Sequence, residues 1–354
     1  MKPRPTTVDT GNAHQRERFR VYMDNALEHR VTQKVWDWEY GLQPDKLVLT
    51  ALQTEEGSIV GSQNFLPVQL VVKGKPEWTV KSENSFVDAA HRGGGTFKEL
   101  YEHGVEVCRQ KNLTTIWGYT AVVKAWRDKL GFTVQENWMQ SCHVWLGVAN
   151  DYSAHGFAKG LAARAYHAWV GFNNRRKFRQ QPKPPAHPNA WKPDFANDDL
   201  NALLERTMPA GTVRLNMSRD YFNWRVVNNP NVTYRYSFLY NDRNQLMAYF
   251  IYSVHQNVAY LAEAVYTPEA ESILWSELCA RLLTENVSSL HYFANRGYAW
   301  CERTIAALER LGGKTQRNAE MNFVLRSTDP RFSNLSNDAS AWYMHALWTE
   351  GFKM

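Results

Sequence analysis

Apolar and polar residues alternate along the first third of the chain in a way that predicts strands. From Lys46, the segment KLVLTALQTEEGSIVGSQNFLPVQLVV contains two β-rich runs on either side of a polar break at residues 55–57. This arrangement predicts an antiparallel hairpin. The next run, EWTVKSENSFVDAA, predicts a third strand that leads directly into the glycine triplet at 93–95.

After the glycines the apolar residues recur at helical spacing, which predicts an amphipathic helix over residues 96–110 with one face on a sheet. The residues at this spacing are Phe97, Leu100, Tyr101, Gly104, Val105 and Cys108. The strand TTIWGYT, the helical segment VVKAWRDKL, a C-terminal glycine cap at Gly131 and the strand FTV follow. Strands with helices between them predict an α/β domain over roughly residues 15–147.

The second half of the chain repeats the features of the first. Trp38 precedes the first hairpin and Trp224 precedes a second one, VTYRYSFLYNDRNQLMAYFIYSV, while DKLGF at 128–132 corresponds to ERLGG at 309–313. Similar spacing of these markers predicts two similar units in tandem. The second unit has TPEAES where the first has its glycines, so only the first carries a glycine loop.

A proline-rich basic stretch, NNRRKFRQQPKPPAHPNAWKP, follows a helical segment at 151–172. Such composition predicts a solvated extended connector, and a patch that touches a membrane or a polyanion is the alternative. We therefore expect a first domain at 1–150, a helix and linker at 151–200, and a second domain at 201–354.

Composition narrows the class of protein. Hydrophobic residues make up 44% and charged residues 21% of the 354 residues, which is typical of a folded protein. A net charge of +6 suits an anionic ligand but lacks the concentrated basic runs of a nucleic-acid binder. The four dispersed cysteines indicate neither a zinc site nor a disulfide framework, and no segment has the apolar length of a signal peptide or membrane helix. We expect a cytoplasmic protein without a metal.

The glycine triplet has the composition of an anion site. Backbone N–H groups that open onto a helix N-terminus present donors and the positive end of the helix dipole, and Arg92 adds a fixed charge. Glycine allows close approach and positive φ. A P-loop is excluded because Thr96 and Phe97 follow Gly95 instead of Lys and Ser or Thr, and a dinucleotide fingerprint is excluded because the preceding strands are antiparallel.

The stretch Arg92-Gly93-Gly94-Gly95-Thr96-Phe97, placed after a strand that ends at Val87, resembles the acyl-CoA loop of the GNAT superfamily of N-acetyltransferases. The resemblance covers about residues 35–135, and the second half resembles the degenerate second unit of some bacterial members. It implies an α+β fold of two tandem GNAT-like domains, each a mixed, mostly antiparallel twisted sheet flanked by helices.

The resemblance also implies the binding residues for acetyl-CoA or another acyl-CoA. The pyrophosphate is expected at the amides of Gly93, Gly94, Gly95, Thr96 and Phe97, with Arg92 beside them. The end of the preceding strand is expected to hold the pantetheine and the acyl carbonyl. The residues at that strand end are Val87, Asp88 and Ala89.

Two residues are candidates for proton transfer. Glu83 lies on the strand before the loop, sharing a face with Val87 by alternation, and a carboxylate there can accept the proton of an ammonium group. A salt-bridged structural carboxylate is the alternative. The family often has a tyrosine donor four residues before Gly131, but Arg127 stands there, so Tyr119, water or a second-domain residue remains as general acid. A residue such as Tyr119 is more often part of the core or a wall of the cleft than a general acid.

Two histidines are less suited to catalysis. His91 beside the loop is expected to pack the loop or face the phosphates. Cys142 and His143 are neighbours on a strand, so their side chains point to opposite faces and do not form a nucleophile and base.

The resemblance implies an N-acyltransferase in which an amine attacks the thioester directly. The acceptor is expected to be the primary amine of a small molecule, with an amino sugar as one candidate because of the positive charge and the many aromatic residues. Two alternatives remain open: a long-chain acyltransferase that takes its acyl group from an acyl carrier protein docked on basic residues around 175–183, and a non-catalytic acyl-CoA-binding protein.

Overall fold

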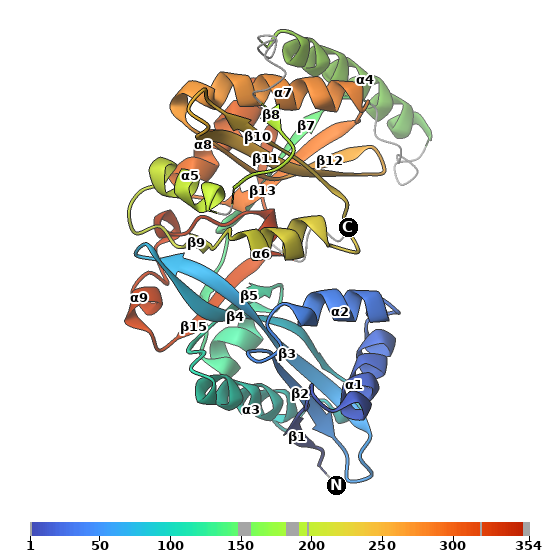
Figure 1. Cartoon of the computed structure of the whole chain (residues 1–354). Helices are drawn as coiled ribbons and strands as arrows, with labels where there is room; N and C mark the ends of the chain where they lie inside the picture. Colours follow the sequence, from blue (N-terminus) through green and yellow to red (C-terminus); the bar gives the residue numbers. More distant parts are fainter. Residues whose placement is uncertain (1, 148–156, 182–190, 197, 319–320, 350–354) are drawn as a thin grey trace. The chain divides into compact units, whose positions relative to one another are not determined.

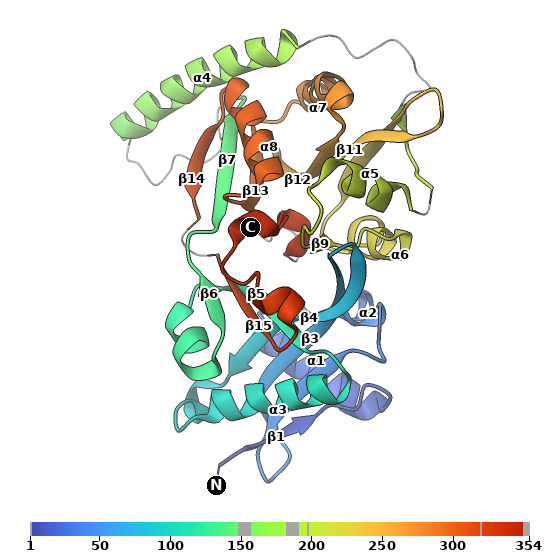
Figure 2. The same ribbon diagram turned by 90° about the vertical axis from the view of Figure 1, so that its left-hand side faces the viewer.

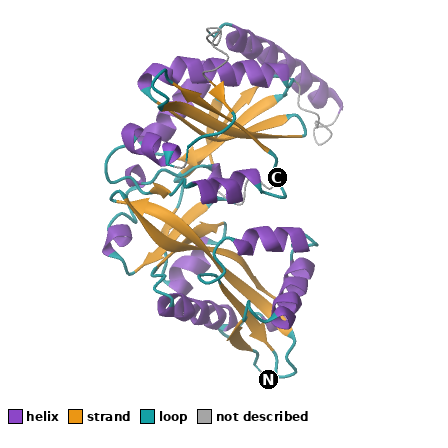
Figure 3. Cartoon of the chain, in the orientation of Figure 1, coloured by secondary structure: helices purple, strands orange, loops and turns teal. Residues whose placement is uncertain are grey.

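The computed structural model describes residues 2–147, 157–181, 191–196, 198–318 and 321–349, with the side chains of 157–162 left out (Figure 1). Contacts divide the chain into two compact units. The first unit comprises Met1–Glu136, Asn228–Asn231 and Ala319–Asp338, and the second comprises Asn137–Val227, Val232–Asn318 and Ala339–Met354. Each unit is built on one sheet with helices beside it (Figure 3).

The sheet of the first unit has the order β1-β2-β3-β4-β5-β15-β6. All neighbouring strands are antiparallel except β4 and β5, which are parallel. The predicted hairpin is present as β2 and β3. The strands are β1 (Arg4–Thr7), β2 (Val48–Gln53), β3 (Ile59–Val72), β4 (Lys75–Val87), β5 (Thr115–Thr120), β6 (Thr133–Gln135) and β15 (Asn322–Ser327).

Helices cover both faces of this sheet. Helices α1 (Ala13–Ala26) and α2 (Gln33–Gly41) begin at the side-chain caps Asn12 and Thr32 and pack on one face through a cluster that includes Leu66. Helix α3 (Thr96–Gln110) has the predicted bounds and packs on the other face, where Phe65 and Tyr101 meet. Neighbouring residues of a strand point to opposite faces, so Phe65 packs against α3 and Leu66 packs against α1 and α2.

The predicted helix VVKAWRDKL is present, since residues 123–130 are helical without a break. Its central part, Ala125–Lys129, is a π-helical turn, and Gly131 with φ +66° lies just beyond the helix. The short helix α9 (Pro330–Ser333) also belongs to the first unit.

The sheet of the second unit has the order β14-β7-β13-β12-β11-β10-β8, with β12 and β13 as its parallel pair. Its strands are β7 (Met139–Trp145), β8 (Trp191–Lys192), β10 (Tyr234–Tyr240), β11 (Leu246–His255), β12 (Val258–Tyr266), β13 (Ser289–Asn295) and β14 (Lys314–Arg317). The remaining elements are β9 (Arg214–Leu215) and the helices α4 (Phe157–Arg179), α5 (Asp199–Thr207), α6 (Arg219–Phe222), α7 (Glu271–Thr284) and α8 (Ala299–Arg310). Both units therefore confirm the predicted class, a mixed, mostly antiparallel sheet flanked by helices.

The two halves of the chain exchange strands. Strand β7 follows β6 in sequence but lies between β13 and β14 in the second sheet, and β15 follows β14 but lies between β5 and β6 in the first sheet (Figure 2). Neither sheet is complete without residues from the other half of the sequence.

The described part of the chain holds four cysteines, all buried and none in a disulfide. Within that part, no helix has the length and apolar character needed to cross a membrane. The same residues contain no group of three or more His, Cys, Asp or Glu side chains arranged for a metal ion.

Candidate functional site

A β-bulge interrupts strand β4 just before the glycine loop. Asn84 and Ser85 together oppose a single residue of β3, Gln63, and Asn84 has φ +53°. A bulge inserts one extra residue and re-aims the side chains that follow it. The chain therefore changes direction at the point where strand β4 approaches the loop.

The bulge corrects the predicted alternation along β4. Glu83 pairs with Asn64 of β3, and Phe86 pairs with Ser62, so Glu83 and Phe86 lie on one face of the sheet. Val87 consequently lies on the other face. The expectation that Glu83 and Val87 share a face is wrong, because the extra residue shifts the period-two pattern by one.

The Gln63 side chain holds the bulge in place. Its amide nitrogen donates to the Ser82 Oγ at 3.0 Å and to the Asn64 carbonyl at 2.7 Å, and its amide oxygen accepts a hydrogen bond from the Ser85 hydroxyl. Gln63 is fully buried, so these bonds replace the backbone pairing that the bulge removes.

Strands β4 and β5 stop pairing part of the way along their length. Their parallel register consists of Val80 with Ile116 and Lys81 with Trp117, although β4 continues to Val87 and β5 to Thr120. We call the portions of the two strands beyond these pairs, residues 82–87 of β4 and 118–120 of β5, the splay. At its start a Cβ on Gly118 would meet the Ser82 carbonyl at 3.0 Å, so the two backbones approach closely before they separate.

The splay places Glu83 and Tyr119 in equivalent positions. Each lies two residues beyond the last register pair, Lys81 with Trp117, and register partners in a parallel pair share a face. The two candidate proton-transfer residues therefore project from the two arms of the splay on the same face of the sheet.

Glu83 is buried in spite of its charge, with 8% of its surface exposed. One carboxylate oxygen is ion-paired with Lys81, whereas Oε2 is buried and has no hydrogen-bond partner among the described residues. Tyr119 is half-buried, and its ring lies edge-on to Phe323 with the ring centroids 5.8 Å apart. Buried polar atoms normally have a partner, so the unpaired Oε2 is a natural place for a ligand donor.

The end of β4 is fixed by its own contacts. The Val87 side chain packs in an apolar cluster with Leu100, and its carbonyl accepts a hydrogen bond from Arg92 Nε at 2.7 Å. Asp88 accepts from the Tyr22 hydroxyl at 3.0 Å; burial, and then this contact, raise the pKa of Tyr22. Ala89 begins a short 3-10 turn that ends at His91.

The three glycines have the backbone shape expected of an anion-binding loop. Gly93, Gly94 and Gly95 have φ values of +103°, +54° and +80°, and Gly95 is the N-cap of α3. Added Cβ atoms on Gly93 and Gly94 would meet no atom within 4 Å, so the loop borders open space. Successive positive φ values at a helix N-terminus turn several N–H groups toward one side.

Several of these N–H groups are available to a ligand. Within the described residues, the N–H groups of Gly94, Gly95 and Phe97 have no intramolecular acceptor. Thr96 differs, because its N–H and its hydroxyl both donate to the Gly93 carbonyl, at 3.0 and 2.9 Å, and thereby close the turn. Phe97 anchors the loop through its packing on Tyr101.

Charged side chains around the loop have mixed signs. The Arg92 guanidinium lies 5.7 Å from the centre of the Phe86 ring. Glu99, in the first turn of α3, is paired with Lys2, whose Nζ also donates to the Gly94 carbonyl at 3.2 Å. Arg127 is ion-paired with Glu136 on the surface, so it does not take the place of a phenolic proton donor.

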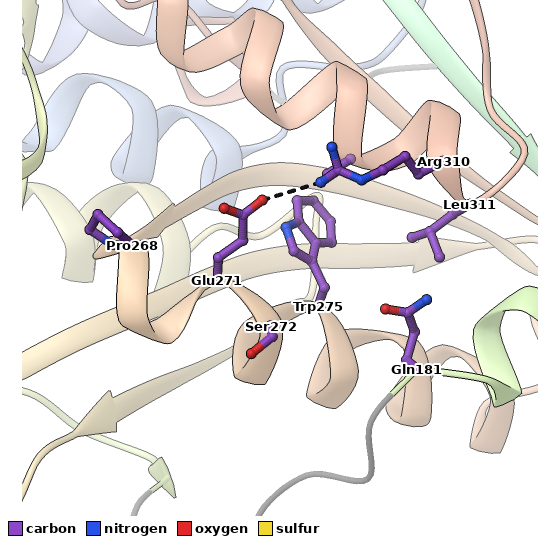
Figure 4. A pocket seen from close by; sticks show the side chains of 8 residues that line it. Gln181, Pro268, Glu271, Ser272, Trp275, Arg310 and Leu311 are labelled. Carbon is purple, nitrogen blue, oxygen red and sulfur yellow. Dashed lines mark hydrogen bonds and ion pairs between the residues drawn. The ribbon is translucent and has the colours of Figure 1, made fainter.

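Among its described residues, the second unit has no glycine loop at the start of the helix that corresponds to α3. A pocket of about 400 Å³ lies beside the start of α7, the counterpart of α3 (Figure 4). Glu271 stands at the first position of that helix and is ion-paired with Arg303 and, at 3.2 Å, with Arg310. A carboxylate already occupies the position where an anion would meet the helix dipole.

The second unit has its own buried carboxylate, which lies just after a β-bulge at Ala262 of β12. Strands β12 and β13 pair in parallel as far as Leu261, and Glu263 lies two residues beyond. It is fully buried, with one oxygen 3.3 Å from His345 Nε2. Burial raises the pKa of Glu263 to about 8 and lowers that of His345 to about 3.

Cys142 and His143 have separate surroundings. Cys142 is fully buried, and burial raises the pKa of its thiol to about 11. His143 instead contacts His291, with a ring nitrogen separation of 3.2 Å.

Sequence reasoning missed the residues that shape the site. Gln63 fills the bulge, Lys81 pairs with the candidate base, and Tyr40 receives hydrogen bonds from Asn64 at 2.8 Å and Asn84 at 3.2 Å. The only sequence feature that could have indicated these contacts was the polar run KSEN at 81–84, inside an otherwise apolar strand. Its meaning depends on partners from β3 and α2, which are distant in the sequence.

No model of a protein family matches the sequence, and no curated protein does. Solved structures match the fold. A protein from Enterococcus faecalis described as a probable N-acyltransferase aligns with a TM-score of 0.65 at 10% identity, covering 91% of this chain and 72% of that one. N-myristoyltransferase from Saccharomyces cerevisiae with bound myristoyl-CoA gives 0.55 at 12% identity, covering 92% and 82%.

A GCN5-related N-acetyltransferase from Anabaena variabilis gives a TM-score of 0.59 at 11% identity, covering 92% of this chain and 73% of that one. These proteins and this chain share one architecture, two mixed sheets flanked by helices. The chain therefore has the fold of the GNAT N-acyltransferases in two tandem units.

Proposed function

We propose that the protein is an acyl-CoA-dependent N-acyltransferase whose first unit holds the acyl-CoA. The observation that carries this proposal is the glycine loop: three positive-φ glycines and unpaired N–H groups at the start of α3, directly after a bulged strand that splays from its parallel neighbour. The loop has the donors and the open space that a pyrophosphate requires.

The remaining parts of the acyl-CoA would follow the strand. Arg92 would supply a positive charge at the loop, and the backbone of β4 from Glu83 to Val87, which lacks β5 partners, would accept the pantetheine amides. The residues proposed to hold the acyl-CoA are Val87, Asp88, Ala89, Arg92, Gly93, Gly94, Gly95, Thr96 and Phe97.

Glu83 and Tyr119 would carry the two proton transfers. Glu83 Oε2 accepts the proton that the acceptor ammonium group must lose before its nitrogen attacks the thioester carbonyl carbon. A C–N bond then forms as the C–S bond breaks, the Tyr119 hydroxyl donates a proton to the departing sulfur, and the second proton that the nitrogen loses restores the Tyr119 hydroxyl. Their positions on opposite arms of the splay, on one face, support this division of roles.

The acceptor is proposed to be the primary amine of a small molecule, and an amino sugar is one candidate. The acyl chain is tested separately, because N-myristoyltransferase, which shares the fold, binds a long-chain acyl-CoA. The experiment is calorimetry of the purified protein with acetyl-CoA, myristoyl-CoA and free CoA, followed by thiol release in the presence of a panel of amines.

Binding together with amine-dependent thiol release is the expected result. Binding without release from any amine would favour an acyl-CoA-binding protein, and release only from an acylated carrier protein would favour the carrier protein as donor. Gly94→Glu should abolish CoA binding because its carboxylate repels the pyrophosphate, whereas Gly94→Asn, which tolerates positive φ, controls for folding. Unchanged affinity in Gly94→Glu would exclude the loop as the site.

A further inference from the structure

Helix α4 concentrates the positive charge of the whole chain. It contains six Lys and Arg residues and no Asp or Glu in Phe157–Arg179. The chain has 41 Lys and Arg and 35 Asp and Glu, so the residues outside α4 hold 35 of each sign. The net charge of +6 is therefore the charge of this one helix.

The same helix displays the exposed aromatic side chains of the described residues. Six large hydrophobic side chains are exposed in that part of the chain, and three of them are dispersed valines. The other three are Tyr166, Trp169 and Phe172, with exposed fractions of 48%, 65% and 67%. Their spacing of three residues puts them on one side of α4, as a stripe that we call the aromatic stripe.

The opposite side of α4 is docked on the second unit. A Cβ on Gly171 would come within 2.6 Å of the Gly147 nitrogen, and Asn174 donates to the Trp145 carbonyl at 2.9 Å. Phe178 is buried, and Arg175 donates to the Val287 carbonyl at 3.1 Å. The aromatic stripe is thus held outward on a fixed helix that lies beside α7 on the outside of the second unit (Figure 1).

Cations lie beside the stripe as well as along the helix. Arg176, Lys177 and Arg179 are exposed at its C-terminal end. Lys314 of β14 donates from Nζ to the Tyr166 hydroxyl at 3.1 Å. Both the apolar and the cationic groups are therefore accessible from the same side of the helix.

We propose that α4 is an interfacial anchor by which the protein binds the surface of an anionic lipid membrane. Trp, Tyr and Phe favour the boundary between headgroups and acyl chains, and Lys and Arg are attracted to anionic headgroups. A docked helix with an outward aromatic stripe and only positive charge has both properties. The anchor is independent of the proposed acyl transfer, since it lies in the unit that lacks the glycine loop.

An acidic protein partner, such as an acyl carrier protein, would also be attracted to the basic end of α4. The aromatic stripe favours lipid, because three large aromatic side chains, each with 48% or more of its surface exposed, lie along one line of the helix without an acidic residue between them. The carrier protein is therefore an outcome of the test and not the proposal.

The test is co-sedimentation of the full-length protein with vesicles of phosphatidylcholine containing about 30% of the anionic lipid phosphatidylglycerol, and with pure phosphatidylcholine vesicles. We expect binding to the anionic vesicles that weakens as salt is raised. The double variant Trp169→Ala, Phe172→Ala should bind at least about tenfold more weakly, and Arg176→Glu, Lys177→Glu should lose binding and its salt dependence.

Matched controls use exposed residues elsewhere in the chain. Val21→Ala, Val227→Ala removes exposed apolar groups, and Lys73→Glu, Lys75→Glu reverses the same charge at the β3–β4 turn. Both should bind vesicles as the natural protein does. All variants change surface residues, and thermal melting checks that each is folded. Quenching by brominated lipid should also be lost in Trp169→Phe.

The proposal is overturned if the protein does not bind anionic vesicles at low salt, or if the α4 variants bind as well as the controls. It is equally overturned if the aromatic variant disrupts only binding to an acyl carrier protein, or only self-association measured by sedimentation equilibrium. CoA calorimetry on the same variants is expected to be unchanged, which separates this result from the fate of the proposed function.

Discussion

Glu83 and Glu263 are buried carboxylates beside a β-bulge in their own sheets, but Glu83 precedes its bulge and Glu263 follows its bulge. Both lie two residues past the last parallel pair, in β4 and β12. Glu83 has one oxygen paired with Lys81 and one unpaired, and it stands near the start of a splay that leads to the glycine loop. Glu263 is sealed among aromatic side chains with His345. The first carboxylate thus has a lysine as its charged partner, and the second has a histidine beside it.

The role of Glu83 is tested by Glu83→Gln. The amide keeps the size of the side chain but cannot accept the ammonium proton, so the acyl-transfer rate should fall about 100-fold at neutral pH. CoA affinity should change little, and the loss should ease at higher pH, where the amine is already neutral. Glu106→Gln, on the exposed side of α3, is the control. An undiminished rate would remove Glu83 as the base.

Glu263 makes a prediction about stability and pH. Its pKa in the folded protein, about 8, lies above the ordinary value of 4.5, so between these values the folded state keeps a proton that the unfolded state has lost. Its contribution to stability is complete below pH 4.5 and is lost as pH rises through about 8. His345, with a lowered pKa, contributes no slope above its ordinary value of 6.5.

The free energy of unfolding, measured with denaturant, should therefore fall by about 1 kcal/mol between pH 7 and pH 8. Glu263→Gln should remove most of that slope, because an amide does not titrate. Glu56→Gln, an exposed change, should leave the slope as it is. Equal slopes in all three proteins would show that Glu263 does not hold its proton in the folded state.

At the scale of elements, the position of the glycine loop depends on how closely α3 packs on β3. A Cβ on Gly104 would lie 2.2 Å from a ring carbon of Phe65, so the helix approaches the sheet more closely than any other residue would allow. The loop at the N-terminus of α3 is placed by this contact. The spacing of Phe97, Leu100, Tyr101 and Cys108 predicted the helix itself, since its apolar face follows one period.

Gly104→Ala tests this packing. The added methyl group overlaps the Phe65 ring, and the resulting strain should destabilise the protein by about 1–3 kcal/mol and weaken CoA binding. In contrast, Gly41→Ala, at the end of α2, has no atom within 4 Å of the new methyl group and should be neutral or slightly stabilising. Thermal melting and calorimetry measure both. Equal stability of the two variants would contradict the close contact.

The elements also show why part of the site escaped prediction. The helix at 96–110 follows from local periodicity, and the loop follows from the conformations that only glycine adopts easily. The bulge at Asn84 could not be predicted in this way, because a bulge is defined by the pairing with another strand, here with Gln63 of β3. The segment VVKAWRDKL is helical as its pattern predicts, with Trp126 and Leu130 in the core beside α3, but nothing in the pattern indicates the π-helical turn at its centre.

At the scale of the whole molecule, the exchange of β7 and β15 makes the two units depend on each other's sequence. Phe323, Val324 and Leu325 of β15 are buried in the first sheet, although they lie at the far end of the chain. The sequence pattern of a buried strand is the same whether the strand joins the sheet of its own half of the chain or the other sheet. The pattern therefore predicted two units but could not indicate that β7 and β15 are exchanged.

The exchange predicts that residues 1–136 do not fold alone. Without β15, the antiparallel partner of both β5 and β6 is missing, and each loses its hydrogen bonds on that side. The register of β6 and β15 shows how the missing strand could be supplied within one fragment. Gln135 pairs with Phe323, so Glu136 and Asn322 are placed to flank a tight hairpin turn. Joining them through Asn-Gly, the preferred two-residue turn, would restore β15 between β5 and β6 in a single fragment.

We therefore expect residues 1–136 joined through Asn-Gly to 322–338 to unfold cooperatively and to bind CoA. Residues 1–136 alone should lack a thermal transition. A third protein, the joined fragment with Val324→Asp, tests whether folding depends on β15 or only on the added length of chain. A charge at that buried position should abolish folding although the length is unchanged. Cooperative unfolding of 1–136 would contradict the exchange. A folded hairpin fragment that binds no CoA would instead show that the glycine loop needs the second unit, and it would confine the first unit's role to the fold.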